Sequence, residues 1–148
     1  MATLATNKRA GFDYELLERY EAGLVLTGQE VKSVKTGHVS LKGSFVTLKG
    51  SAPYLTNATI TKYKFAGDAK DYDPNRPRKL LLKKSEIKSL IGKIQSRGLT
   101  LVPIRVYTRK KLVKLEFAVA KGKKKFDKRQ GIAKREAERK AERALKNF

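Results

Sequence analysis

Five stretches of the chain alternate apolar with polar residues or gather β-branched and aromatic residues, which predicts a protein built mostly of β-strands. The predicted strands are Tyr14–Leu26, Ser44–Lys49, Tyr54–Tyr63, Leu99–Thr108 and Leu112–Ala120. The polar triplet Arg109-Lys110-Lys111 joins the last two and indicates a hairpin. Gly23 predicts a bulge or bend in the first strand, and Pro103, which lacks an amide donor, predicts an edge strand or a bulge.

Two segments between these strands carry helix signals. Thr27 and Glu30 have the spacing of a capping box, so a short helix is expected from there to about residue 36, ended by Gly37. Ser85 is expected to cap a second helix, which ends before Gly98. Four apolar residues of this second helix recur at helical spacing and predict a core-facing stripe, namely Ile87, Leu90, Ile91 and Ile94.

Residues 66–79 hold one glycine, two prolines and three aspartates, a composition typical of a loop. About six short strands and two or three helices therefore make up the folded part. Such a set favours a mainly β fold with flanking helices, in the form of a small antiparallel barrel of the oligonucleotide-binding (OB) type. Closing the sheet into a barrel removes the exposed strand edges that would otherwise pair with other chains.

The charge divides the chain into two parts. Its 148 residues carry a net charge of +21, of which residues 1–120 hold +13 and residues 121–148 hold +8. We expect residues 1–120 to form the barrel and residues 121–148 to form a basic tail, disordered when free and helical when bound to RNA. Three arginines form a ridge along that helix, and Phe126 lies in a basic run where its ring suits base stacking. So strong an excess of positive charge indicates a polyanionic partner, with nucleic acid as the default.

Several function classes are not expected. The chain lacks cysteine, so disulfides and thiolate metal sites are excluded and the cytosol is favoured. No apolar run is long enough to span a bilayer, and the first residues do not resemble a secretory signal. His38 follows a predicted helix end and is expected in a turn. Asp68, Asp71 and Asp73 are able to bind Mg²⁺, but they lie in a proline-containing loop, so we expect no metal, no cofactor and no catalysis.

Basic residues concentrate between Arg76 and Lys111, a span with a single acidic residue, which makes it the candidate phosphate-facing surface. Four strand aromatics are possible stacking platforms, although on alternating strands about half of such rings face the core: Tyr54, Tyr63, Tyr107 and Phe117.

Six strings of residues, in order along the chain, resemble the family of SmpB, the small protein B that binds transfer-messenger RNA (tmRNA) in bacteria. These are Asn7-Lys8-Arg9-Ala10, Tyr20-Glu21-Ala22-Gly23, Gly28-Gln29-Glu30-Val31-Lys32-Ser33, the stretch Asp73-Pro74 with Arg76 and Arg78-Lys79-Leu80-Leu81-Leu82, Ala120-Lys121-Gly122-Lys123-Lys124, and Asp127-Lys128-Arg129. The resemblance implies an OB barrel with flanking helices and a basic tail. It also implies an RNA-binding, non-catalytic factor for ribosome rescue.

The family implies particular partners. A monomer would bind the tRNA-like domain of tmRNA in a 1:1 complex and deliver it, with elongation factor Tu and GTP, to stalled ribosomes. The barrel would stand where a tRNA anticodon arm lies. The tail would occupy the decoding centre and the empty mRNA channel, which places the protein on ribosomes in the cytoplasm.

The resemblance also implies roles for individual residues. Expected tmRNA contacts are Asn7, Glu21, Leu81, Lys114, Arg78, Lys79, Lys121, Lys123 and Lys124. Expected contacts at the decoding centre and ribosome are Phe126, Asp127, Lys128, Arg129, Arg135, Arg139 and Arg143. Phe126 stands where the family often has histidine, so a stacking role is kept and a role that needs a protonated ring is not.

Two other functions share this composition. A ribosomal or other structural RNA-binding protein would also be basic and carry a basic tail. An RNA-processing enzyme would use the aspartates of the 66–79 loop to bind Mg²⁺ and cleave RNA.

Overall fold

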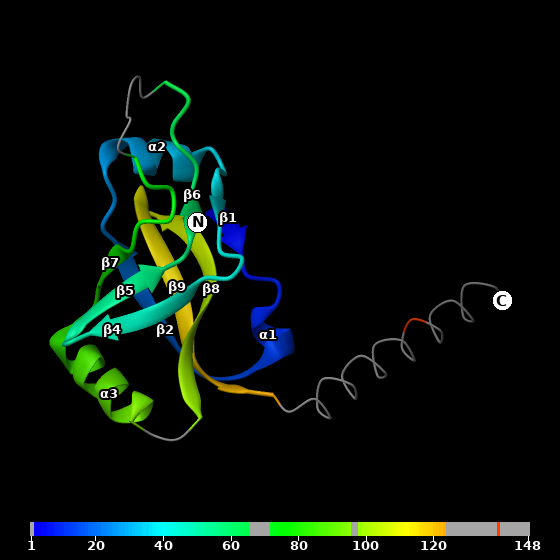
Figure 1. The fold of residues 1–148 in the computed structure, drawn as a ribbon, viewed down its shortest axis with the longest axis vertical. Helices are drawn as coiled ribbons and strands as arrows, with labels where there is room; N and C mark the ends of the chain where they lie inside the picture. The colour runs from blue at the N-terminus through cyan, green and yellow to red at the C-terminus, as the bar shows by residue number, and fades with distance from the viewer. Residues whose placement is uncertain (1, 66–71, 96–97, 124–138, 140–148) are drawn as a thin grey trace.

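The computed structural model describes residues 2–65, 72–95, 98–123 and 139 and forms a small twisted barrel with three helices around it (Figure 1). In chain order, the described elements are β1 (Ala2–Thr6), α1 (Ala10–Asp13), β2 (Tyr14–Leu24), α2 (Gly28–Lys35), β3 (Val39–Ser40), β4 (Phe45–Lys49), β5 (Ala52–Thr56), β6 (Thr59–Ile60), β7 (Arg78–Leu81), α3 (Lys84–Ile94), β8 (Leu99–Arg109) and β9 (Leu112–Gly122). Among the described residues, no helix is long and apolar enough to cross a membrane.

The main sheet has seven strands in the order β1-β8-β9-β2-β7-β5-β4, and β3 pairs with β6 in a separate two-stranded sheet. The pairings in both sheets are antiparallel. The last strand in the order, β4, also contacts β8, so the sheet curls back on itself and encloses the core. This is the mainly β, antiparallel architecture with flanking helices that the sequence predicts.

The core lies between the inward faces of the long strands. It contains Ala22, Leu80, Leu90, Leu101, Val106, Leu115, Phe117 and Val119, all almost fully buried. Tyr20 stacks on Phe117 with ring centroids 5.7 Å apart. Leu90 comes from α3, so the apolar stripe of that helix packs on the barrel as its spacing predicts.

Helix α2 begins with the predicted capping box. The Glu30 amide donates to the Thr27 hydroxyl at 3.3 Å, and the Thr27 amide donates to the Glu30 carboxylate at 3.0 Å. Gly37, with φ +85°, follows the helix end in the left-handed conformation that glycine adopts without strain. His38 lies in the turn beyond it, with its ring Nδ1 2.8 Å from the Thr36 hydroxyl, which confirms the predicted turn.

The start of α3 differs from the prediction. The residue before its first turn is Lys83 rather than Ser85, and the Lys83 amide donates to the Glu86 carboxylate at 3.2 Å. Glu86 therefore binds the amide of the residue that begins the helix, and α3 starts two residues earlier than a cap at Ser85 would give.

Three strand predictions need correction. The stretch 54–63 is two strands, β5 and β6, because Asn57 has φ +62° and turns the chain between them. The irregularity of β2 lies between Leu16 and Glu18 rather than at Gly23. β9 continues past Ala120 to Gly122. In contrast, the bulge predicted at Pro103 is present, and Lys110 and Lys111 form the predicted β8–β9 hairpin.

Some described elements have no clear sequence signal. β1 pairs with β8, although about a hundred residues separate the two strands, and α1 and β3 have only four and two residues. β7 begins inside the stretch predicted as a loop, because Arg78 and Leu80 point inward and allow it to pair with β2 and β5.

Candidate nucleic-acid interface

Three strands bring Glu21, Leu81 and Lys114 to one outward surface. Gly23 of β2 is the register partner of both Leu81 in β7 and Lys114 in β9, and Glu21 lies two residues before it on the same face. We call the surface formed by Glu21, Gly23, Leu81, Arg109 and Lys114 the outer face. A hollow of about 310 Å³ opens on it, lined by Gly23, Leu24, Leu26, Val31, Leu81, Lys111, Leu112, Val113 and Lys114.

This hollow is lined mostly by apolar residues, with Lys111 and Lys114 as its polar members. A Cβ atom on Gly23 would lie 3.5 Å from the Leu81 Cβ, so the absence of a side chain there keeps the space open. In β7 the inward residue is Leu80, whereas Leu81 points outward and is 57% exposed. Leu112 is 61% exposed. Exposed leucines gathered at a hollow mark a place where another molecule can bind.

The Glu21 carboxylate interacts with two cationic side chains and with a tyrosine hydroxyl. Its carboxylate lies 3.4 Å from the Arg109 guanidinium and 3.8 Å from the Lys114 ammonium. The hydroxyl of Tyr107, whose side chain is buried, donates to the same carboxylate. That hydrogen bond and the two cations lower the pKa of Glu21. Burial, together with the bond to Glu21, raises the pKa of Tyr107 well above its ordinary value.

A second carboxylate continues this arrangement along the same strands. Glu116 lies 2.9 Å from Arg19 of β2 and 3.1 Å from Arg105 of β8. The Arg105 guanidinium lies 4.4 Å from the Tyr107 ring centroid and covers the buried ring. The face thus presents an ordered set of cations, each near a carboxylate that fixes its position.

Arg78 does not reach this surface. Its side chain is fully buried, donates to the carbonyl oxygens of Ala58 and Pro74 at 2.9 Å, and forms an ion pair with Glu30 at 2.7 Å. Arg76 binds the other oxygen of Glu30. Burial favours the neutral form of Glu30, but hydrogen bonds from Thr27 and the two arginines outweigh it and lower the pKa. The Arg78 guanidinium is therefore used inside the fold and is not exposed on the outer face.

The predicted lysines fall in different places. Lys79 is exposed, because it points away from the core between the inward-facing Arg78 and Leu80, and Lys121 is exposed near the end of β9. Lys123 is tied to α1: its amide donates to the Asp13 carbonyl at 3.0 Å and its ammonium to the Gly11 carbonyl at 2.9 Å. Figure 1 shows β9 leaving the barrel beside α1.

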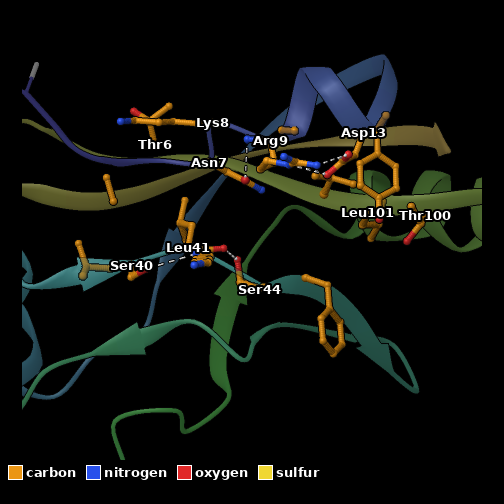
Figure 2. Close-up of a pocket in the computed structure, with 18 residues that line it drawn as sticks. Thr6, Asn7, Lys8, Arg9, Asp13, Ser40, Leu41, Ser44, Thr100 and Leu101 are labelled. Atoms are coloured by element: carbon orange, nitrogen blue, oxygen red, sulfur yellow. Dashed lines mark hydrogen bonds and ion pairs between the residues drawn. The ribbon is translucent and has the colours of Figure 1, made fainter. Parts of the chain in front are cut away.

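Asn7 lies apart from the outer face. Its side-chain amide donates to the Pro103 carbonyl at 2.9 Å, and its backbone amide to the Ile104 carbonyl at 2.7 Å, so it holds the β8 bulge. It lines a second hollow of about 840 Å³, between the segment around α1 and the strands β3 and β4 (Figure 2). The two hollows share no lining residue. The structure therefore separates Asn7 from the other three residues that the resemblance implies.

The four candidate stacking aromatics also separate. Tyr107 and Phe117 are buried, so neither ring offers a free face. Tyr54 is half-buried with the Lys49 ammonium 5.7 Å from its ring centroid, and Tyr63 is half-buried beside Lys32 of α2. Of these four aromatic residues, only Tyr54 and Tyr63 remain available for stacking.

Other predicted residues lie outside the described part of the chain. They are Asp68, Asp71, Lys124, Phe126, Asp127, Lys128, Arg129, Arg135 and Arg143, whereas Arg139 is described as helical and exposed. Within residues 2–65, 72–95, 98–123 and 139, no group of three or more metal-ligating side chains is brought together. Asp73 accepts a hydrogen bond from the Asn75 amide at 2.9 Å, which fixes a local turn.

Sequence reasoning missed the groups that organise the outer face. The sequence predicts a bend at Gly23, a stacking ring at Tyr107 and a hairpin residue at Arg109, but not that the three share one face. Arg105 and Glu116 look like ordinary strand charges. A signal exists in the spacing: Arg105, Tyr107 and Arg109 recur every second residue, as do Leu112, Lys114 and Glu116. Period-2 alternation places each set on one face of its strand.

A small antiparallel barrel whose outward face combines ordered cations with an apolar hollow is a nucleic-acid-binding protein by its fold and surface. A family model described as "SmpB protein" matches residues 4–147. The chain therefore belongs to the SmpB protein family.

Relatives and a solved structure agree with this assignment. An SsrA-binding protein of Halothermothrix orenii is 50% identical over 143 residues, which cover 97% of this chain and 92% of that protein. An SsrA-binding protein of Thermosipho africanus is 48% identical over 147 residues, covering 99% and 98%. A chain of the structure described as "tmRNA-SmpB: a journey to the center of the bacterial ribosome" is 45% identical, with a TM-score of 0.66, covering 81% of this chain and 84% of that one.

Proposed function

We propose that this protein binds the tRNA-like domain of tmRNA through its outer face and brings it to stalled ribosomes. The observation that carries the proposal is geometric. Glu21, Leu81 and Lys114 come from three separate strands and lie on one outward face, where Leu81 and Lys114 line a hollow and Glu21 contacts Lys114, in a chain of the SmpB family. SsrA-binding proteins and an SmpB structure on the ribosome are its relatives, which supports the same partners here.

The chemistry of the outer face suits a folded RNA. The hollow between Leu81 and Leu112 accepts the apolar face of a ribose or a base. Lys114, Arg109 and the exposed Lys79 neutralise phosphates and supply the salt-dependent part of the affinity. Glu21 is an acceptor for a ribose 2′-hydroxyl or a base amine, which a purely basic surface lacks.

Asn7 takes part in a different way. Because its side chain holds the Pro103 carbonyl of β8, we propose that it keeps the hairpin that presents Tyr107 and Arg109 in position. An Asn7→Ala variant should bind the RNA less tightly and also unfold at a lower temperature, whereas a Lys114→Ala variant should lose only RNA affinity.

The basic segment 121–148 completes the proposal. It enters the decoding centre and the empty mRNA channel, where Phe126, Asp127, Lys128 and Arg129 meet ribosomal RNA and the arginines at 135, 139 and 143 line one side of a bound helix. Elongation factor Tu and GTP act on the charged tmRNA, and one copy of the protein binds one RNA in the cytoplasm. The protein itself performs no catalysis.

Affinity purification from cells at moderate salt, followed by sequencing of the retained RNA, tests the main proposal. One structured RNA, tmRNA, should dominate, and a Glu21→Ala, Lys114→Ala double variant should lose it. A ribosomal protein would instead retain ribosomal RNA at a 1:1 ratio with ribosomes, and that result would contradict the proposal.

Removing residues 130–148 tests the division of labour between barrel and tail. The truncated chain should bind the isolated tRNA-like domain within a few-fold of the full chain but fail to support rescue of stalled ribosomes. A collapse of RNA affinity would show that the barrel does not carry the binding.

A further inference from the structure

Two aromatic rings, the half-buried Tyr63 and the exposed Phe65, follow β6 at the end of the barrel where α2 lies. Phe65 is 75% exposed, the most exposed large apolar side chain among the described residues. Its ring meets the Tyr63 ring edge to face, with centroids 5.6 Å apart. A phenylalanine this exposed is costly in water unless it serves as a binding surface.

Lysines surround this pair. The Lys32 ammonium of α2 lies 5.7 Å from the Tyr63 ring centroid, and the Lys64 ammonium 5.6 Å from that of Phe65. Lys62 is exposed in the same segment. We call Tyr63 and Phe65, with Lys32 and Lys64, the aromatic platform. Cations beside exposed rings match the two needs of a nucleotide, which are a stacking surface for the base and positive charge for its phosphate.

The backbone leading to the platform is fixed to the fold. The Thr61 amide donates to the His38 carbonyl at 3.1 Å, and the Ser33 hydroxyl of α2 donates to the Thr61 carbonyl. The Ile60 amide donates to the Pro74 carbonyl at 2.9 Å, and the Tyr72 hydroxyl donates to the Ile60 carbonyl at 2.6 Å. The chain therefore enters the platform from a position set by α2 on one side and by residues 72–74 on the other.

The buried ion pairs reinforce this position. Glu30 of α2 binds Arg78, and Arg78 also holds the carbonyls of Ala58 and Pro74 on either side of β6. The arginine that the resemblance assigned to RNA thus helps to place the segment that carries Tyr63. The buried ion pairs of Glu30 therefore affect the position of the aromatic platform at the surface.

The platform is continuous with the outer face. Val31 of α2 lines the hollow beside Leu81, and the next residue, Lys32, stands over Tyr63. One short helix therefore borders both surfaces, and an RNA seated on the outer face needs only to cross α2 to reach the aromatic rings.

We propose that the aromatic platform stacks an unpaired base of the same tRNA-like domain that the outer face binds. The exposed Phe65 ring receives the base, Tyr63 supports it from the edge, and Lys32 and Lys64 meet the flanking phosphates. This inference rests on the proposed function and names a further contact for it. RNA rather than protein is the partner, because a largely exposed ring stands beside two lysines that form no ion pair with any of the described residues.

The test compares full-length Phe65→Leu with Phe65→Tyr in binding to the transcribed tRNA-like domain at fixed salt. Leucine keeps the apolar volume and loses the ring, so the dissociation constant should rise about 5- to 10-fold, the low end of measured stacking losses. Tyrosine keeps the ring and should bind within about 2-fold of the parent chain. Phe45→Leu, at an exposed ring on the other hollow, is the matched control and should bind unchanged.

Salt dependence separates stacking from charge. Phe65→Leu should leave the slope of log K against log salt unchanged, whereas Lys32→Ala should reduce its magnitude by roughly 0.7–0.9, the value of one phosphate contact. Benzoylphenylalanine at position 65 should cross-link to an unpaired nucleotide of the RNA under ultraviolet light. Far-UV circular dichroism should show the same fold in all variants, because the side chains of Phe65, Phe45 and Lys32 are exposed.

The results distinguish a failure of this inference from a failure of the proposed function. If Phe65→Leu binds like the parent while Glu21→Ala and Lys114→Ala lose affinity, the platform is not a tmRNA contact but the outer face is. Equal losses for Phe65→Leu and Phe65→Tyr would also overturn stacking, as would a loss confined to binding of ribosomes. If none of the variants, outer face included, alters binding, the proposed function itself fails.

Discussion

Glu21 and Glu30 are each held by two cations, and their surroundings are opposite. Glu21 lies on the outer face between Arg109 and Lys114, with its side chain 38% exposed. Glu30 lies between Arg76 and Arg78 with its side chain fully buried. The same local chemistry therefore appears both at the surface and in the buried interior.

The difference in burial determines what each cluster of charges can do. A buried charge without its partner costs several kcal/mol, so the Glu30 cluster is fixed and helps to set the position of α2. Exposed pairs are weak and are screened by salt, so the cations of the Glu21 cluster can exchange their carboxylate for a phosphate. Burial, rather than composition, separates a structural cluster from a binding one.

The largest expected effect comes from breaking the buried pair. Arg78→Met should lower the free energy of unfolding by about 3–5 kcal/mol, because Glu30 is left buried with one cation at the rim. The matched change Arg109→Met on the outer face should cost no more than about 1 kcal/mol. Urea titration followed by circular dichroism measures both, and equal losses would remove the distinction between the clusters.

Removing the surface lysine should affect RNA and not the fold. Lys114→Ala should weaken binding of the tRNA-like domain about 5-fold, which corresponds to about 1 kcal/mol, and reduce the salt slope by roughly 0.7–0.9. Lys42→Ala removes an equal charge beside the other hollow and serves as the control. A salt slope that stays the same in Lys114→Ala would exclude a phosphate contact there.

Acid should act on the buried glutamate. The folded-state pKa of Glu30 lies below its ordinary value of 4.5, so its contribution to stability is present above about pH 4.5 and is lost as the pH falls through the lower folded value. The unfolding free energy of the parent chain should therefore fall more steeply below pH 4.5 than that of Glu30→Gln. Parallel curves for the two chains would mean that Glu30 titrates alike in the folded and unfolded states.

The smallest expected effect concerns the hollow itself. Gly23→Ala should stabilise the fold by about 0.5–1 kcal/mol, because glycine in a strand costs conformational entropy. The added methyl would contact Leu81 at about van der Waals distance and narrow the hollow, so RNA affinity should fall by about 2- to 3-fold, under 1 kcal/mol. Tighter binding in this variant would show that the hollow is not occupied.

Local patterns predict the elements that local forces determine. The capping box at Thr27 and Glu30, the stripe around Leu90 and the bulge at Pro103 are confirmed because each depends on neighbours in sequence. Asn57 illustrates the limit of prediction from local patterns: the residues around it favour one long strand, but Asn57 has φ +62° and β6 beyond it pairs with β3 instead of continuing β5.

Local patterns are also insufficient to predict the arrangement of the candidate site. The resemblance identifies Glu21, Leu81 and Lys114, but not that they share Gly23 as register partner or neighbour. The sequence Arg78-Lys79 looks uniformly basic, yet alternation turns one residue inward to Glu30 and the other to solvent. Which of the two points inward depends on a carboxylate 48 residues away, and no local pattern contains that information.

The pairing of β1 with β8 has a consequence for synthesis. β1 leaves the ribosome well before its partner, residues 105–108 of β8, and Asn7 has its hydrogen-bond partner 96 residues further on. At about 5–20 residues per second, β1 waits roughly 5–20 seconds for β8. The nascent chain must keep an unpaired strand edge free of other contacts during that interval, and the barrel reaches its native connectivity only when the β8–β9 hairpin has emerged.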